Sequence, residues 1–237
     1  MKRYIPARIV LFPGLGADPR MFGRQKRVFG DDLECPGWLT PNTDETFDTY
    51  TNRWAKRLEP EPGDDRPLFL GGVSFGGMVA MGMARHLSPT AVILIGSCRS
   101  RHAKPPRWQT ARRIGDMIPD RLLGRRVLAA AALWVSVLDR LDSEHRALLM
   151  SMAADSDPNL VRWSGHACAQ WDLDSADMPG FPAVHQVHGR LDAIIPLHPG
   201  DPDVVIPDGR HLIHFSHPHT VNRFIMGVVR RHAGTAP

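Results

Sequence analysis

The chain has 237 residues, of which 43% are hydrophobic and 23% charged, and its formal net charge is +4. These values are ordinary for a globular protein, and the chain is long enough to form one large domain with a substantial core. No apolar run approaches the ~20 residues that a membrane-spanning helix needs. The basic start Met1-Lys2-Arg3 runs into Pro6 and Arg8, which is not typical of a signal peptide.

The cysteines bear on the cellular compartment and on metal binding. Cys35, Cys98 and Cys168 are odd in number and far apart in the sequence. They match neither a zinc-site spacing nor a disulfide framework, so we expect reduced thiols in a cytoplasmic protein with no metal or other cofactor.

Strand-like and helix-like stretches alternate over the first third of the chain. Each apolar run ends in a loop or turn, and an amphipathic stretch follows it. Strands are expected at Arg8–Phe12, Asp32–Pro36, the start of Leu68–Gly77 and Ala91–Ile95, and helices after Asp18, from Asn42 or Thr43 onward, and up to Leu87. This alternation predicts right-handed crossovers and a parallel sheet.

The alternation stops between Arg99 and Pro182, where only helical patterns occur. Helices are predicted near Trp108–Met117, at Arg121–Leu138, at Ser143–Ala153 and after Asp157-Pro158. We therefore expect an all-helical lid over residues 99–181, inserted into a core formed by residues 1–98 and 182–237.

The chain returns to the core pattern after the predicted lid. Strands are expected at Val184–Gly189 and Asp203–Pro207, and an amphipathic helix at Ser216–His232. The predicted fold class is α/β, a doubly wound and mostly parallel sheet with an inserted helical lid.

A Gly-x-Ser-x-Gly pattern, Gly72-Val73-Ser74-Phe75-Gly76, lies where a predicted strand breaks into a predicted helix. Such a turn exposes the serine hydroxyl above the sheet and directs the N–H groups of the helix toward an anion formed beside it. The pattern predicts a catalytic serine at Ser74; the alternative is a turn in which Ser74 only caps the helix.

A serine nucleophile needs a base and an acidic partner for that base. Asp192 follows a predicted strand, and His211 lies in the loop before the last helix. The order Ser74, Asp192, His211 is the one that doubly wound sheets use. The alternatives are Asp201 or Asp203 as the acid, and as the base one of the histidines His214, His217 and His219. His188 is interpreted as a turn residue, and the pair His211 and His214 is not expected to bind metal because no acidic or cysteine ligand accompanies it.

These residues resemble those of the α/β-hydrolase superfamily, over residues about 7–98 and 182–233. The resemblance implies that Ser74 is the nucleophile, Asp192 the acid and His211 the base. It also implies an oxyanion hole made by the N–H of Phe75 and an N–H of the loop Pro13–Gly16, for which Leu15 is the best candidate. Many relatives carry histidine where this chain has Pro13.

The predicted lid begins with a basic stretch, in which nine Arg and Lys residues between Arg99 and Arg126 face only Asp116 and Asp120. This stretch is interpreted either as a solvated face or as a basic rim that attracts an anionic substrate or an acidic partner. No nucleic-acid-binding signature accompanies it. Four lid tryptophans are expected to pack between lid and sheet, with one or two lining a substrate pocket: Trp108, Trp134, Trp163 and Trp171.

The expected activity is hydrolysis of a small-molecule acyl ester through an acyl-enzyme, without cofactor, nucleic acid or membrane. A serine nucleophile argues against the dehalogenase and epoxide hydrolase branches, which use aspartate there. The alternatives are an acyl-thioesterase acting on carrier-protein or coenzyme A thioesters, which the Ser-Phe-Gly-Gly sequence resembles, and a non-catalytic ligand receptor on the same fold.

Overall fold

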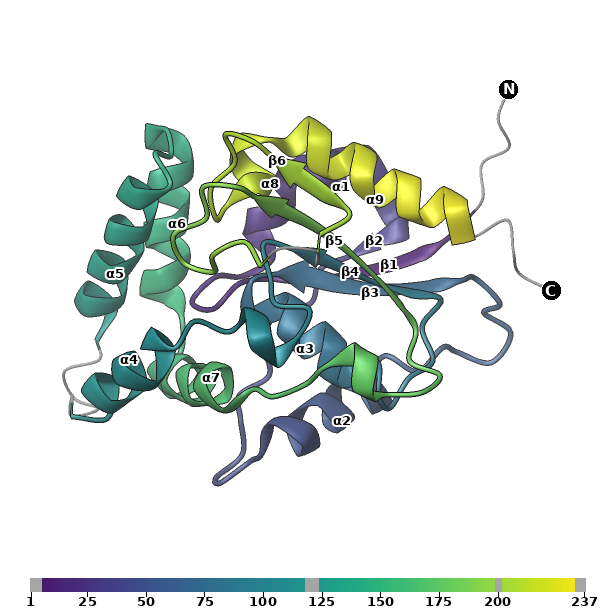
Figure 1. Cartoon of the computed structure of the whole chain (residues 1–237), viewed down its shortest axis with the longest axis horizontal. Coiled ribbons are helices and arrows are strands. Elements are labelled where there is room, and N and C mark those ends of the chain that lie inside the picture. The colour runs from purple at the N-terminus through teal and green to yellow at the C-terminus, as the bar shows by residue number, and fades with distance from the viewer. Residues whose placement is uncertain (1–5, 118–123, 199–201, 233–237) are drawn as a thin grey trace.

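A six-stranded sheet forms the centre of the molecule, and every neighbouring pair of strands is parallel (Figure 1). The computed structural model describes residues 6–117, 124–198 and 202–232. The strand order is β2-β1-β3-β4-β5-β6. The strands are β1 (Arg8–Phe12), β2 (Leu33–Glu34), β3 (Leu68–Val73), β4 (Ala91–Ile95), β5 (Ala183–Gly189) and β6 (Val204–Ile206). The predicted parallel α/β sheet is confirmed.

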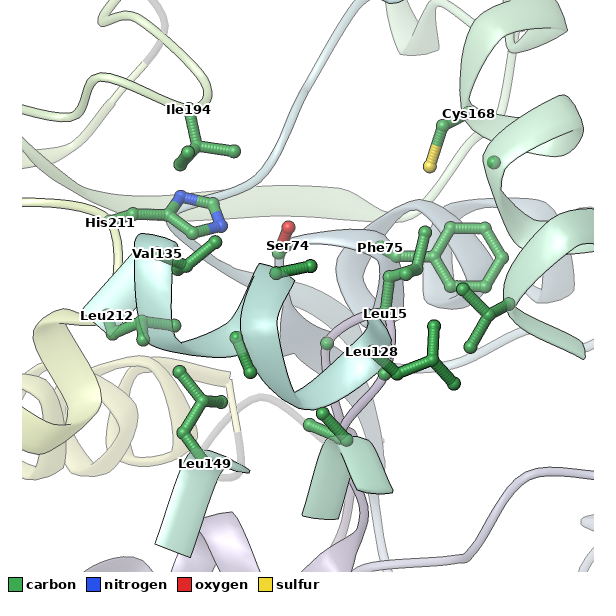
Figure 2. A pocket seen from close by; sticks show the side chains of 18 of the residues that line it. Leu15, Ser74, Phe75, Leu128, Val135, Leu149, Cys168, Ile194, His211 and Leu212 are labelled. Carbon is green, nitrogen blue, oxygen red and sulfur yellow. The ribbon is translucent and has the colours of Figure 1, made fainter. Parts of the chain in front are cut away.

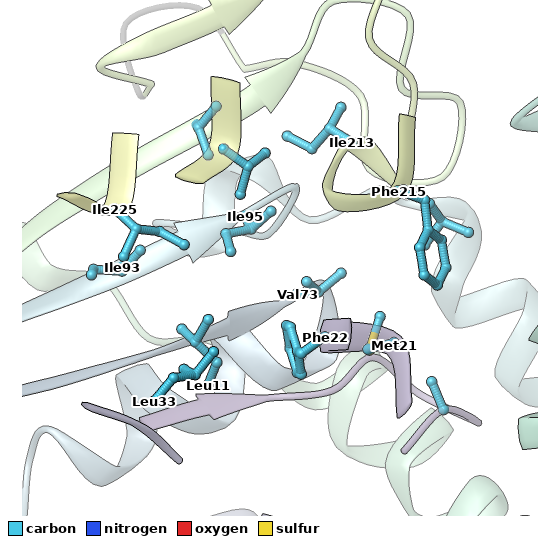
Figure 3. Packing of buried hydrophobic residues seen from close by; sticks show 14 of the residues in the cluster. Leu11, Met21, Phe22, Leu33, Val73, Ile93, Ile95, Ile213, Phe215 and Ile225 are labelled. Atoms are coloured by element: carbon cyan, nitrogen blue, oxygen red, sulfur yellow. The ribbon is translucent and has the colours of Figure 1, made fainter. Parts of the chain in front are cut away.

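Both faces of the sheet are buried, which explains why its central strands are continuous apolar runs. Successive side chains of a strand point to opposite faces. In β1, Leu11 therefore packs into the core under α1 (Gly23–Phe29) and α9 (Pro218–His232), which Figure 3 shows, whereas Val10 packs under α2 (Phe47–Arg57) and α3 (Phe75–Met83). Two hydrophobic layers thus hold the sheet between two pairs of helices (Figure 1).

Two helices begin later than the sequence pattern predicts. A turn around Asp44, whose φ is +56°, occupies the start expected for α2, and Glu45 accepts a hydrogen bond from the Asn42 N–H at 2.8 Å. The side chain of Thr46 then caps α2. The last helix starts at Pro218, because a separate short helix, α8 (Ile213–Ser216), precedes it.

The chain between β4 and β5 is helical, and we call residues 99–181 the helical segment. Its helices are α4 (Arg107–Asp116), α5 (Arg125–Leu138), α6 (Ser143–Asp155) and α7 (Pro158–Gln170). The start predicted for α5, Arg121, lies outside the described residues. Helices α5 and α6 pack against each other at one end of the molecule, and α7 packs against α4 and α3 (Figure 1). The boundaries 1–98, 99–181 and 182–237 stay a prediction.

The two ends of the described chain lie away from the helical hairpin α5–α6. In Figure 1, β1 begins and α9 ends on the side of the sheet opposite to these two helices. The loops that follow the strands face α5 and α6 instead, since loop residues such as Leu15 and α5 residues such as Leu128 line one cavity.

Candidate active site

Ser74 occupies the sharp turn between β3 and α3. Its φ is +53° and its ψ is −119°, a conformation that an L-residue rarely adopts. The turn is fixed on both sides: the Ser74 N–H donates to the Ile95 carbonyl at 3.1 Å, and the Ser97 hydroxyl donates to the Ser74 carbonyl at 2.7 Å. The predicted strand–serine–helix turn is therefore present.

Glycines surround Ser74 because the backbones approach too closely for side chains. A Cβ on Gly72 would lie 2.4 Å from the Gly76 carbonyl carbon, and a Cβ on Gly76 would lie 2.2 Å from the Phe12 oxygen. These contacts bring the loop after β1 against the turn. A Cβ on Gly14, in that loop, would meet the Ser74 Cβ at 3.8 Å.

His211 and Asp192 form a buried hydrogen-bonded pair. The Nδ1 atom of His211 lies 2.8 Å from Oδ2 of Asp192, and the two residues are only 4% and 5% exposed. The Nδ1–H therefore donates to the carboxylate, and Nε2 is left to accept a proton. Figure 2 shows the His211 ring and the Ser74 hydroxyl turned toward each other.

The carboxylate of Asp192 is held by the loop that carries it. Its Oδ1 atom accepts the N–H groups of Ile194 and Ile195, each at 2.8 Å. The His188 ring also contacts this loop, with Nε2 at 2.8 Å from the Ile195 carbonyl and 3.3 Å from Asp192 Oδ2. His188, interpreted from the sequence as a turn residue, lies in β5, and its ring contacts the Asp192 carboxylate.

The two ionisable partners shift each other's pKa. Burial alone raises the pKa of Asp192, but attraction to His211 and hydrogen bonds from His188 and His211 outweigh it and bring the pKa well below its ordinary range. Burial lowers the pKa of His211, whereas the charge and hydrogen bond of Asp192 and the charge of Asp139 raise it, and the net pKa lies above the ordinary value. A protonated His211 is thus favoured by its surroundings.

A cavity of about 430 Å³ opens beside Ser74 and His211 (Figure 2). Its walls come from the loops after the strands and from α5, α6 and α7. Most of its lining side chains are apolar, among them Leu15, Met21, Phe75, Leu128, Val135 and Ile194. Volume and lining suit a small apolar ligand.

Leu15 and Phe75, the predicted oxyanion-hole residues, both line this cavity. Phe75 is the first residue of α3, so its N–H has no acceptor within the helix. Leu15 belongs to the loop that lies against Ser74. Two other N–H groups of this loop have acceptors elsewhere: that of Gly14 contacts Met21 Sδ at 3.4 Å, and that of Ala17 donates to the Gly14 carbonyl at 3.1 Å.

Among the described alternative acids and bases, Asp203 and His217 contact groups other than Ser74. Asp203 contacts His185 and the Gln186 N–H, and His217 contacts Asp208. His219 is exposed, whereas His214 is fully buried. Asp201 lies outside the described residues. Within the described ranges, no group of three or more His, Cys, Asp or Glu side chains is placed to hold a metal ion.

Sequence reasoning missed three residues at this site. Arg162 and His166 line the cavity from one face of α7, one helical turn apart. Their spacing of four residues was the available signal. Asp139, at the end of α5, accepts hydrogen bonds from the backbone of the His211 loop. No local pattern announces that contact, because 72 residues separate Asp139 and His211.

Several cations of the basic stretch make internal contacts. Arg99 donates to the Val184 carbonyl, Arg107 to the carbonyls of Ala193 and Ile194, and Lys104 to those of Ala169 and Trp171. These side chains thus attach the helical segment to the core and to itself. Among the four tryptophans, Trp108 lines the cavity, Trp171 is buried, Trp163 packs on Tyr50, and Trp134 is 62% exposed, so the prediction that all four pack inside is wrong for Trp134.

The described part of the chain contains no helix that is both long enough and apolar enough to cross a bilayer.

Comparison with solved structures identifies the same fold in several proteins. A thermophilic esterase from Thermogutta terrifontis superposes with a TM-score of 0.71 at 21% identity, over 96% of this chain and 91% of that one. An esterase from Exiguobacterium antarcticum gives 0.71 at 14% identity, over 96% and 93%. MenH from S. aureus gives 0.70 at 19% identity, over 98% and 96%.

A comparison with curated protein sequences gives no match. The model of the alpha/beta hydrolase family, in contrast, matches residues 9–224. The chain therefore belongs to the alpha/beta hydrolase family and is a hydrolytic enzyme.

Proposed function

We propose that the protein hydrolyses carboxylic esters through an acyl-enzyme on Ser74, with His211 as the base and Asp192 as its acidic partner. One observation carries the proposal. The Ser74 hydroxyl and the His211 ring face each other at the wall of an apolar cavity (Figure 2), and Nδ1 of the ring lies 2.8 Å from Oδ2 of Asp192.

The chemistry follows from this arrangement in two steps. His211 Nε2 accepts the hydroxyl proton while Ser74 Oγ attacks the ester carbonyl, and the same proton then passes to the departing alcohol. A water molecule next attacks the acyl-enzyme while His211 accepts its proton; the acyl–Oγ bond breaks, the acid is released, and His211 returns the proton to Ser74 Oγ. We expect the N–H groups of Leu15 and Phe75 to donate to the oxyanion in both steps, because both residues line the cavity beside Ser74.

The cavity supports a substrate with a small to medium apolar acyl group. Its lining is mostly apolar, and about 430 Å³ is within the usual range for pockets that bury a small ligand. Two of the solved structures with this fold are described as esterases. Arg99, Lys104 and Arg107 of the basic stretch donate to backbone carbonyls of this chain. Side chains held in this way are less suited to binding an acidic carrier protein, which favours an oxygen ester over a carrier-bound thioester.

The test is reaction with a fluorophosphonate probe, followed by mass mapping of the adduct. We expect labelling at Ser74 in the wild type, none in Ser74→Ala, and little in His211→Ala, with all three proteins folded by circular dichroism. Wild-type protein that is folded but unlabelled would contradict the proposal. In that case, a small ligand that is bound and recovered unchanged would support a receptor.

The ester class is tested separately, with oxygen and sulfur esters of one acyl group. We expect higher kcat/KM for the oxygen ester. A clear preference for the sulfur ester would replace the esterase with the thioesterase on the same residues.

A further inference from the structure

Asp139 connects the helical segment to the loop of His211. It is the C-cap residue of α5 and is only 6% exposed. Its Oδ1 atom accepts the His211 N–H at 3.0 Å, and its Oδ2 atom accepts the Leu212 N–H. Both oxygens accept N–H groups, which favours the ionised carboxylate, whereas burial outweighs these contacts and raises the pKa of Asp139 above its ordinary value.

A second contact joins the same two elements. The guanidinium of Arg210 donates through Nη1 to the Leu138 carbonyl at 3.0 Å. Three consecutive residues of the loop, Arg210, His211 and Leu212, therefore bond to the last residues of α5. The position of the histidine backbone is set by the helical segment, whereas the position of its ring is set by Asp192 in the core.

The end of α5 is itself fixed by its backbone. The N–H of Leu141 donates to the Ser136 carbonyl at 3.0 Å, and the N–H of Arg140 donates to the Val137 carbonyl at 3.1 Å. With Arg140 at a φ of +54°, this is the hydrogen-bond pattern of a Schellman motif. Asp139 is thus held at a defined place when it meets the loop.

The charges around His211 come from several elements. Asp192 contacts its ring and Asp139 its backbone, and the buried His214 interacts electrostatically with both His211 and His145. Both carboxylates raise the pKa of His211, against the effect of burial. The buried pair of acids therefore compensates the positive charge that His211 acquires when it takes the proton of a nucleophile.

We infer that Asp139 is a positioning residue for His211: it holds the backbone of the base and stabilises its protonated form from the helical segment. This inference rests on the proposed function. It implies that residues 99–181 do more than cover the cavity, since they supply a carboxylate on which the base depends.

The experiment compares Asp139→Asn with Asp142→Asn. Both changes remove one carboxylate of the α5–α6 turn, but Asp142 caps α6 and bonds His145 and no residue of the loop 210–212. We expect kcat of Asp139→Asn to fall by about tenfold or more with KM nearly unchanged. The acid limb of its pH profile should move to lower pH, as should the NMR titration of the His211 ring. Asp142→Asn should match the wild type, and Asp139→Glu should recover part of the activity.

Several results would overturn the inference. One is a folded Asp139→Asn variant whose kcat per labelled Ser74 and His211 titration equal those of the wild type, because this is the behaviour of a merely structural residue. If Asp139→Asn does not fold, the wild type still gives the answer. Its His211 and Leu212 amide protons should shift as the Asp139 carboxyl titrates, and invariant shifts would refute the contact.

The two proposals fail in different ways. A wild type without a labelled Ser74 refutes the ester chemistry, yet the NMR titration of His211 in Asp139→Asn remains readable. A labelled wild type with an unaltered His211 in Asp139→Asn refutes only the role of Asp139.

Discussion

His211 is nearly fully buried between two carboxylates, one on its ring and one on its backbone. If His211 is the base, as we propose, this arrangement meets two requirements. The ring must be neutral to accept a proton, and its protonated form must be stable enough to exist for the duration of a catalytic step. Because the pKa of His211 is raised, its surroundings favour the protonated form over the neutral form.

The raised pKa predicts the pH dependence of the reaction. kcat/KM should rise with pH as His211 loses its proton, with a midpoint above the ordinary value of 6.5. In Asp192→Asn, the ring loses its anionic partner, so the midpoint should move to lower pH and kcat should fall by about 10³- to 10⁴-fold. pH–rate profiles of the two proteins check this prediction.

Asp203→Asn is the matched control, since Asp203 was the rival acid and contacts His185 instead. It should leave the profile as in the wild type. If Asp203→Asn were as inactive as Asp192→Asn, or if Asp192→Asn kept its midpoint, the assignment of the acid would be refuted.

At this scale, the sequence was informative where chemistry is local. The turn around Ser74 could be predicted because Gly72 and Gly76 are required by the approach of nearby backbones. Asp139 could not, because its partners are the N–H groups of a loop that is distant in sequence, and any residue can supply an N–H. His188 and Asp192 lie four residues apart, but only the fold shows that both face the same loop.

Two helical glycines, Gly165 and Gly227, have open space beside them but lie in different surroundings. Substituting them separates an effect on stability from an effect on substrate specificity. A Cβ on Gly227 in α9 or on Gly165 in α7 would meet no atom within 4 Å. Gly227 is exposed, whereas Gly165 lines the cavity. An added methyl group at either position should therefore improve helix propensity, but only the one at Gly165 lies at the cavity proposed to bind the substrate.

We predict that Gly227→Ala and Gly165→Ala each stabilise the protein by about 0.5–1 kcal/mol, the ordinary gain from alanine in a helix. Gly165→Ala should in addition lower kcat/KM for esters with long acyl groups relative to short ones. Urea denaturation and a series of p-nitrophenyl esters measure both effects. Equal ester selectivity in the two variants would contradict the place given to Gly165.

Elements were predicted well where burial dictates the pattern and less well where a side chain competes with the backbone. Strands β1 and β4 have the predicted bounds because they are buried on both faces. Helix α2 starts later because the turn at Asn42–Glu45 satisfies its own hydrogen bonds. Strand β2 is shorter than predicted, since a 3-10 turn at Gly30–Asp32 uses the residues before it.

At the scale of the whole molecule, the buried His214 bears on how stability depends on pH. His214 is fully buried and packs on the rings of Phe22 and Phe215, and its two ring nitrogens have no hydrogen-bond partner among the described residues. Burial, followed by repulsion from His211 and His145, lowers its pKa to about 3. The unfolded chain would bind a proton there at a much higher pH.

This difference predicts acid sensitivity of the fold. The folded pKa lies below the unfolded one, so His214 contributes stability above pH 6.5 that is lost as pH falls toward 3. The loss is about 1.4 kcal/mol for each pH unit below the unfolded pKa. In His214→Leu, the free energy of unfolding should fall less between pH 7 and pH 5 than in the wild type.

Urea denaturation at the two pH values measures the change, and other titrating groups cancel in the comparison. The exposed His219 supplies the control, since His219→Leu should keep the wild-type pH dependence. An equal pH dependence in His214→Leu would show that His214 is protonated in the folded protein.

The overall topology could be predicted because alternating strands and helices permit few arrangements. How the helical segment lies on the sheet could not be predicted. That placement depends on contacts such as Arg107 with the Ala193 carbonyl and Asp139 with His211, for which the sequence has no signature.

The start of β1 and the end of α9 lie on the side opposite to the helical hairpin that borders the cavity (Figure 1). This placement has a practical consequence. A fluorescent label or affinity tag attached at the first residues of β1 or the last residues of α9 would lie on the side of the sheet away from the hairpin α5–α6.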